Sequence, residues 1–260
     1  MDGELHWVGG PTWILRVEGV KIACDPVLCP AGTIQNYGWF RSRRLEAPGY
    51  AEEDFQDIDL WLITHQHEDH LDAAGLAHID AGAHVVTHAN ALPKLRQARC
   101  VSVIPLAWFH QRRLTIKDCE ITIEAMPAVH GVNPLSAWFA GGGNGYWFTV
   151  TRNQTTRSFY VTGDTVTVKP VLHALRGRTV DVLIPHMGAA KQGSLIMALT
   201  LSAAMLRRLM DLLAPTITIP VHFGTFEHYA EPITVVEQWH NDAVRILAPG
   251  QRCQFTLGAP

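Results

Sequence analysis

Short apolar runs separated by turn residues dominate the chain, and their alternation predicts strands with intervening helices. Residues 12–24 alternate apolar and polar positions on either side of Glu18 and Gly19, which predicts two strands joined by a tight turn in which Gly19 has a positive φ. Other apolar runs of strand length are found at residues 60–64, 84–87, 101–104, 114–116, 121–125, 146–151, 158–162, 182–185, 217–221 and 245–247. The polar residues 152–157 predict a hairpin loop.

Helical patterns stand between these strands. Apolar positions at helical spacing are found at residues 90–99, 201–213 and 233–240. The first helix is expected to begin near Asn90, and the second has Thr200 as a predicted N-cap and Pro215 just beyond its end. The pattern indicates an α/β or α+β fold, and the length is compatible with a single domain over residues 1–260.

The composition is that of a globular protein. Hydrophobic residues make up 47% of the chain, and the net charge of −3 gives no basic field that would attract nucleic acid. The N-terminal residues do not resemble a secretory signal, and the apolar run at residues 195–206 is shorter than the ~18–20 residues that span a bilayer. We therefore expect a cytoplasmic protein with a small-molecule substrate, no nucleic-acid partner and no membrane segment; a homo-oligomer stays open.

The cysteines are odd in number and scattered along the chain. They are Cys24, Cys29, Cys100, Cys119 and Cys253. None has the paired spacing of a zinc ribbon, so we interpret them as reduced thiols in the core rather than as metal ligands.

A histidine-rich segment follows the apolar run at residues 60–64. Its side chains include His65, His67, Asp69 and His70. Alternate residues at the end of a strand share a face, so the first two imidazoles can converge on one metal ion, whereas the other two lie past the turn and can reach a second. So many ligand types within six positions predict a metal site with two adjacent cations.

Four later segments place a polar side chain where a predicted strand ends and a turn begins. They contain His130, Asp164, His186 and His222. A buried polar group without a partner costs ~1–3 kcal/mol, and metal binding would remove that cost.

With these residues in order, the chain resembles the metallo-β-lactamase-fold hydrolase superfamily. Its five motifs are matched by Asp25, the run from His65 to His70, His130, Asp164 and His222. Residues 181–189, 213–215 and 220–226 are similar to the branch of L-ascorbate-6-phosphate lactonase and the bacterial relatives of N-acyl-phosphatidylethanolamine phospholipase D. The chain departs from that branch at His186, where a small or aliphatic residue is more usual.

The resemblance implies a four-layer αββα sandwich with a two-metal site at one edge of the two sheets. It assigns the metal ligands as follows: His65, His67 and His130 on the first ion, Asp69, His70 and His222 on the second, and Asp164 between them. Asp25 would orient a ligand histidine.

The ligand types suit two divalent ions, with zinc first and manganese or iron as alternatives. Two such ions ~3.5–4 Å apart can hold a bridging hydroxide as the nucleophile. Asp69 would orient this nucleophile and carry a proton to the leaving group. His186 is a second catalytic candidate and His228 a further donor, and for each a structural or surface histidine is the alternative.

The function that we expect is metal-dependent hydrolysis of a small ester, lactone or phosphodiester. A mononuclear iron sulfur or persulfide dioxygenase and a catalytically degenerate binding protein are the alternatives. His67 argues against the flavodiiron oxidoreductases, which carry Glu at that position. Residues 32–48, with Tyr37, Trp39 and Phe40, and residues 135–145, with Trp138 and Phe139, are candidate specificity loops; their aromatic residues could instead pack beneath the loops or form a dimer contact.

Overall fold

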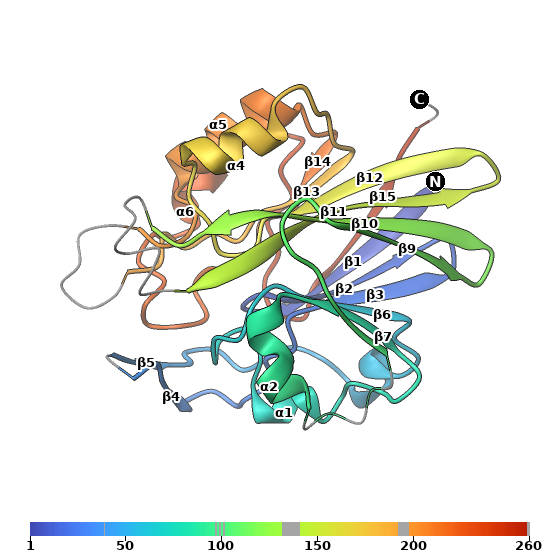
Figure 1. Cartoon of the computed structure of the whole chain (residues 1–260). Coiled ribbons are helices and arrows are strands. Elements are labelled where there is room, and N and C mark those ends of the chain that lie inside the picture. Colours follow the sequence, from blue (N-terminus) through green and yellow to red (C-terminus); the bar gives the residue numbers. More distant parts are fainter. Residues whose placement is uncertain are drawn as a thin grey trace.

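Two large sheets pack face to face in the computed structural model, which describes residues 1–38, 40–96, 98, 100, 102–131, 141–191 and 198–258 (Figure 1). The first sheet has, in spatial order, the strands β15 (Arg252–Thr256), β1 (Asp2–Gly9), β2 (Thr12–Val17), β3 (Val20–Cys24), β6 (Leu60–Ile63), β7 (His84–Thr87) and β8 (Ser102–Pro105). The second has β14 (Ile217–Thr218), β13 (Val182–Ile184), β12 (Thr155–Val161), β11 (Gly142–Arg152), β10 (Cys119–Val129) and β9 (Gln111–Ile116).

Helices lie on the outer faces of the two sheets. The first sheet is covered by α1 (Ala73–Leu76) and α2 (Leu92–Leu95), and the second by α4 (Lys169–Leu175), α5 (Ala203–Leu213) and α6 (Thr234–Glu237) (Figure 1). Two 3₁₀ turns, η1 (Glu52–Phe55) and η2 (Ala89–Ala91), belong to the connections of the first half. The layers therefore follow the predicted αββα order.

Both sheets are mixed, and this fixes where loops can meet. The β15-β1-β2-β3 pairs are antiparallel, and β3, β6, β7 and β8 then run parallel. In the second sheet β9 to β12 are antiparallel and β12, β13 and β14 run parallel. Parallel neighbours end at the same edge, so the loops after these strands collect there.

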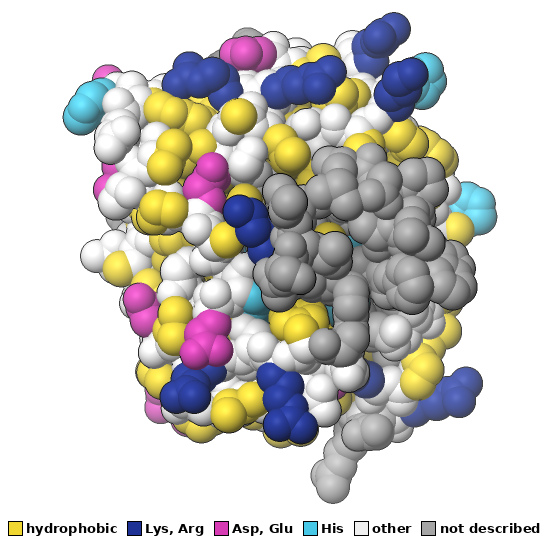
Figure 2. Space-filling model, turned by 90° about the vertical axis from the view of Figure 1, so that its left-hand side faces the viewer, with side chains coloured by type: hydrophobic (Ala, Val, Ile, Leu, Met, Phe, Trp, Pro, Cys, Tyr) yellow, Lys and Arg dark blue, Asp and Glu magenta, His cyan; other side chains and the backbone are white. Residues whose placement is uncertain are grey.

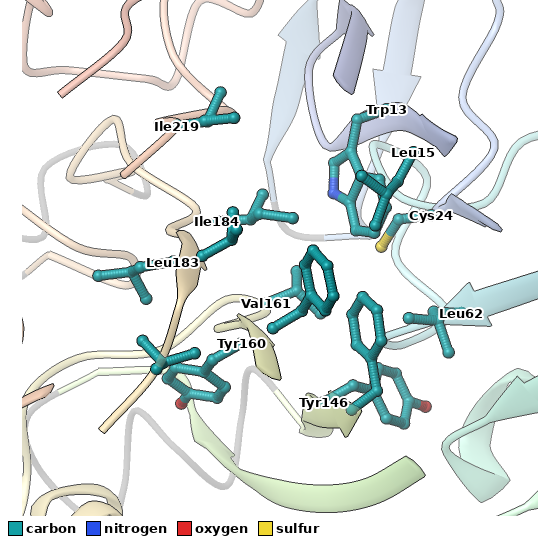
Figure 3. Packing of buried hydrophobic residues seen from close by; sticks show 14 of the residues in the cluster. Trp13, Leu15, Cys24, Leu62, Tyr146, Tyr160, Val161, Leu183, Ile184 and Ile219 are labelled. Carbon is teal, nitrogen blue, oxygen red and sulfur yellow. The ribbon is translucent and has the colours of Figure 1, made fainter. Parts of the chain in front are cut away.

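The core lies between the two sheets, where alternate residues of each strand point inward. Figure 3 shows Trp13 and Leu62 of the first sheet opposite Tyr146 and Val161 of the second, and all four are fully buried. Burial of apolar surface stabilises the sandwich by ~25 cal/mol per Å². Among the described residues, this core cluster contains none of the candidate metal ligands.

The strand predictions of the first half are largely confirmed. The turn between β2 and β3 lies at the predicted place, and Gly19 has a φ of +80°. The prediction of a strand at residues 245–247 is wrong. Val244 forms an isolated bridge to Thr218, and the ladder does not continue because Pro249 soon follows and has no amide hydrogen to donate. The last strand is instead β15.

Several helix predictions need correction. Helix α5 is capped by Ser202, whose side chain accepts a hydrogen bond from the Met205 amide, and not by Thr200, whose hydroxyl donates to the Met187 carbonyl. The helix expected at residues 90–99 is a 3₁₀ turn followed by α2, which ends at Leu95; residues 97 and 99 lie outside the described residues. Helix α6 is shorter than expected, and α1 and α4 were not predicted.

Residues 32–48, the first candidate specificity loop, contain a small hairpin. Its strands are β4 (Ile34–Asn36) and β5 (Arg41–Arg43), and they form a separate two-stranded sheet. In Figure 1 this hairpin projects from the side of the sandwich where the loops after the parallel strands collect. Trp39, like Trp138 and Phe139 of the second expected specificity loop, lies outside the described residues. Among the described helices, none is long and apolar enough to cross a membrane.

Candidate metal centre

The candidate site lies where the parallel strands of both sheets end. Asp25 follows β3, and the histidine-rich run begins two residues after β6. From the second sheet, Asp164, His186 and His222 follow β12, β13 and β14. Residues almost 200 positions apart in the chain therefore meet at one edge of the sandwich.

The first donor group consists of His65, His67 and His130, whose donor atoms lie within 4.8 Å of one another. The Nε2 of His65 is 2.8 Å from the Nδ1 of His67, and the Nδ1 of His65 lies 2.9 Å from the Thr64 hydroxyl. Within the described residues, neither ring nitrogen of His130 has a hydrogen-bond partner, although the side chain is only 2% exposed. A buried imidazole left unpaired in this way fits a metal ligand.

The second donor group consists of His70, Asp164, His186 and His222, again within 4.8 Å of one another. The Nε2 of His70 lies 3.1 Å from both the Nε2 of His222 and the Oδ2 of Asp164. The Nε2 of His222 is 3.4 Å from the other carboxylate oxygen of Asp164. This carboxylate also faces the first group, with its Oδ2 3.7 Å from the Nε2 of His130.

Protein groups hold the outer nitrogens of the two histidines in the second group. The Nδ1 of His70 lies 2.8 Å from the Oδ2 of Asp25, and the Nδ1 of His222 lies 3.1 Å from the Met187 carbonyl oxygen. Each acceptor suits a ring proton on Nδ1, and the Nε2 of each ring faces inward, an arrangement that is typical of histidine ligands.

Asp69 lies at the border of the second group and not within it. Its Oδ2 is 3.6 Å from the Nε2 of His222 and 4.0 Å from the Nε2 of His70. The same oxygen faces the Nε2 of His228 at 3.1 Å and accepts a hydrogen bond from the Tyr229 hydroxyl at 3.3 Å. Asp69 is thus held between the donor group and the cavity described below.

His186 occupies a different position from the one a substrate-contacting residue would need. Its side chain is fully buried, its Nδ1 lies 3.3 Å from the Oδ1 of Asp164, and its backbone amide lies 2.9 Å from the Thr162 hydroxyl oxygen. It does not line the cavity. The structure therefore brings His186 to the site from behind the carboxylate.

Burial and neighbouring charges divide the titratable groups into two kinds. Burial lowers the pKa of His65 well below its ordinary value and that of His67 to about 3, and neighbouring imidazoles add to both effects. Burial alone would raise the pKa of Asp164, but His222 and His70 hold it well below its ordinary range. His65 and His67 are thus neutral imidazoles near neutral pH, whereas Asp164 is an ionised carboxylate.

A cavity of about 230 Å³ opens onto both groups. Its lining residues are Asn36, Tyr37, Phe40, Gln66, His67, Glu68, Asp69, Lys94, His130, Asp164, Ala190, Leu199 and His228. Figure 2 shows this side of the molecule, where histidine side chains are visible beside hydrophobic ones. The volume is below the range typical of drug-sized ligands, which indicates a small ligand.

The donor chemistry fits divalent metal ions. Imidazole and carboxylate donors suit Zn²⁺, Mn²⁺ or iron, and the two groups lie side by side with Asp164 facing both. Cys24 and Asp25 lie near His186 in a third grouping, but the Asp25 carboxylate already accepts hydrogen bonds from the Thr64 amide at 2.7 Å and hydroxyl at 2.6 Å.

Three contributors to the site were not predicted from the sequence. Thr64 links Asp25 to the histidine-rich run, Tyr229 donates to Asp69, and Ser42 lies 2.6 Å from the Nδ1 of His228. The position of Thr64, directly before the run, was the one local signal that could have been used.

Comparisons with known proteins agree with this geometry. A family model described as "Beta-lactamase superfamily domain" matches residues 21–223. A curated protein, N-acyl-phosphatidylethanolamine-hydrolyzing phospholipase D 1 of Caenorhabditis elegans, is 33% identical over 73 residues, which are 28% of this chain and 20% of that protein. The match thus spans about a fifth of that relative's length.

Solved structures resemble the whole chain. A possible metal-dependent hydrolase from Veillonella parvula DSM 2008 has a TM-score of 0.81 and 20% identity, with 96% of this chain and 98% of that chain covered. An isothiocyanate hydrolase from Delia radicum gut bacteria has a TM-score of 0.80 and 21% identity, with 98% and 99% covered. At these identities the likeness concerns the fold.

Proposed function

The chain belongs to the beta-lactamase superfamily, and from this premise we propose that it is a metal-dependent hydrolase that cleaves a small ester, lactone or phosphodiester. The observation that carries the proposal is the pair of donor groups that adjoin at Asp164 and open onto one small cavity. A single structural metal would need only one closed set of ligands. Two adjacent sets that reach a cavity are typical of hydrolytic centres.

We assign the ligands of the first ion as His65, His67 and His130, and those of the second as His70, His222 and Asp69, with Asp164 between the ions. Zinc is the first choice, with manganese or iron as alternatives. When bound, the ions supply a water nucleophile of lowered pKa and stabilise negative charge that develops on the substrate.

The chain's own residues then have separate tasks. Asp69 reaches the cavity, and although its burial favours the protonated form, His70, His222 and His228 hold its pKa well below the ordinary value, so it is ionised. Its Oδ2 is the atom that would accept a proton from the attacking water and pass it to the leaving group. The contacts of this oxygen with His228 and Tyr229 keep the carboxylate directed for that transfer.

The test starts with the metal content of the purified protein, measured by elemental analysis. The metal-loaded protein is then assayed on matched esters, lactones, phosphodiesters and an aromatic isothiocyanate, the last because one protein of similar fold is an isothiocyanate hydrolase. We expect about two ions per chain and hydrolysis that a chelator abolishes and added metal restores.

Two results would contradict the proposal. One iron per chain together with oxygen consumption on a persulfide would identify a dioxygenase. A protein that retains metal but hydrolyses no member of the panel would instead point to a binding function.

A further inference from the structure

An aromatic pair forms one wall of the cavity. Tyr37 and Phe40 lie in the connection between β4 and β5, and their rings stack with centroids 4.3 Å apart and an interplanar angle of 12°. The edge of this pair meets the site histidines: Tyr37 is 6.2 Å from the His67 ring, and Phe40 is 5.7 Å from the His228 ring. The wall therefore stands directly beside the first donor group.

Hydrogen bonds fasten this wall to the histidine-rich run. The Gln35 side chain is 5% exposed and donates to the Glu68 carbonyl at 2.8 Å, and its own oxygen accepts from the Tyr37 hydroxyl at 2.7 Å. Glu68 lies between two of the assigned ligands in the sequence. The position of Tyr37 is thus coupled to that of the metal ligands.

A second set of contacts fastens the other end of the hairpin. The Arg43 amide donates to the Glu227 carboxylate at 3.0 Å, and the Leu45 amide donates to the Thr225 carbonyl at 2.8 Å. These partners follow His222 in the chain. Because the hairpin is held at both ends, little ordering is needed when a ligand binds against it, and such preorganisation favours affinity.

Aliphatic side chains add to the apolar part of the cavity lining: Ala190 and Leu199 are 3% and 8% exposed. Outside the two donor groups, the polar part of the described lining consists of Asn36, Gln66, Glu68, Asp69, Lys94 and His228. A slot with aromatic and aliphatic side chains in its lining suits a flat apolar group, because stacked and edge-to-face contacts add to the gain from burial.

The charges in the lining do not favour a second anionic group on the substrate. Lys94 is the cationic side chain among the described lining residues, and its Nζ donates to the Glu68 carboxylate at 2.6 Å and to the Leu71 carbonyl at 2.9 Å. A phosphate would have to compete for this ammonium group with a carboxylate already paired to it.

We propose that the substrate carries a flat, uncharged aromatic group of about one ring next to the bond that is cleaved, and that this group packs against Phe40 and Tyr37. The inference rests on the proposed hydrolase function and narrows its substrate class. It separates simple aromatic esters or lactones from phosphorylated sugars.

The experiment uses the metal-loaded protein and four methyl esters with the same scissile bond: phenylacetate, cyclohexylacetate, acetate and hydrogen succinate. We expect kcat/KM for the phenylacetate ester to exceed that of each of the others by at least tenfold. Phe40→Leu keeps an apolar side chain but removes the ring, and it should reduce the preference for phenylacetate over acetate about tenfold. Phe109→Leu is the matched control, because Phe109 is 56% exposed and outside the cavity lining.

A second measurement does not depend on a variant. Calorimetric titration of the metal-loaded wild-type protein should show free phenylacetate binding at least tenfold more tightly than acetate or cyclohexylacetate. Hydrolysis of all four esters at similar rates, or a preference for succinate, would overturn the inference and leave the hydrolase proposal intact. Absence of hydrolysis on every ester, lactone, phosphodiester and isothiocyanate would overturn both.

Discussion

The Oδ2 of Asp25 lies 2.8 Å from the Nδ1 of His70, and both side chains are completely buried. The opposite nitrogen of the same ring faces Asp164 and His222. The Asp25 carboxylate therefore favours a proton on the Nδ1 of His70 and fixes how the ring is oriented. A contact of this kind adjusts a metal site without touching the metal.

Replacing Asp25 by Asn should weaken metal binding at the second donor group by about 10–100-fold, because the amide is a weaker acceptor for the ring proton of His70. Asp25 has a φ of +41°, which Asn tolerates well, so the backbone should not change. Metal retention against a competing chelator measures the effect. Asp57→Asn is the control, since Asp57 is exposed and has a φ of +57°; equal retention in both variants would contradict the assigned role.

Replacing His67 by Ala should lower metal-dependent turnover by about 100-fold or more, because the first donor group loses one of three imidazoles. The variant should still fold, since the core between the sheets does not include this side chain. Elemental analysis and far-UV circular dichroism check the two parts separately. His110→Ala, at an exposed histidine, should retain full activity. Unchanged metal content in the His67 variant would refute the ligand assignment.

The metal-free protein should lose stability as the pH falls from about 6.5 toward 3. Burial, with the neighbouring His130 imidazole, lowers the pKa of His67 from 6.5 to about 3 in the folded state. Between these values the unfolded chain binds a proton at His67 that the folded chain does not, so the free energy of unfolding rises with pH across this window. Urea titrations at pH 5 and pH 7.5 should show a smaller difference for His67→Ala than for wild type. An identical difference would show that His67 is not the group involved.

Replacing His186 by Leu should reduce kcat with little change in KM, because His186 contacts Asp164 and not the cavity. His186→Asn offers a side-chain N–H near the position of Nδ1 and should restore much of the loss. Metal retention is the second measurement, with a decrease of about tenfold expected for the Leu variant. Equal defects in the two variants would indicate that His186 only fills space.

Several strands were predictable because an apolar run of strand length ended in polar residues. Strand β6 is such a case, with four buried residues directly before the histidine-rich run. Strand β1 was missed because His6 interrupts its apolar pattern; this histidine is 1% exposed and lies 2.9 Å from the Gly49 carbonyl. Strand β15 pairs with β1 from the other end of the chain, a contact that local pattern does not reveal.

The site was predictable to the extent that its residues are local or follow strands. The run from His65 to His70 is recognisable by its spacing alone. The partners of Asp69 were not recognisable, because His228 and Tyr229 are 159 and 160 positions away in the chain and no local pattern links them to it. That residues 1–260 form one domain, and that the site residues have the assigned roles, stay predictions.

The 3.1 Å approach of His70 to His222 joins residues 152 positions apart, in loops that follow strands of different sheets. An ion held by both would act as a removable cross-link that closes most of the chain into a loop. Unfolding would then require release of the ion, and each hundredfold excess over the dissociation constant would add ~2.7 kcal/mol to the free energy of unfolding. The melting temperature would thereby serve as an affinity scale, by which different metals could be ranked without any substrate.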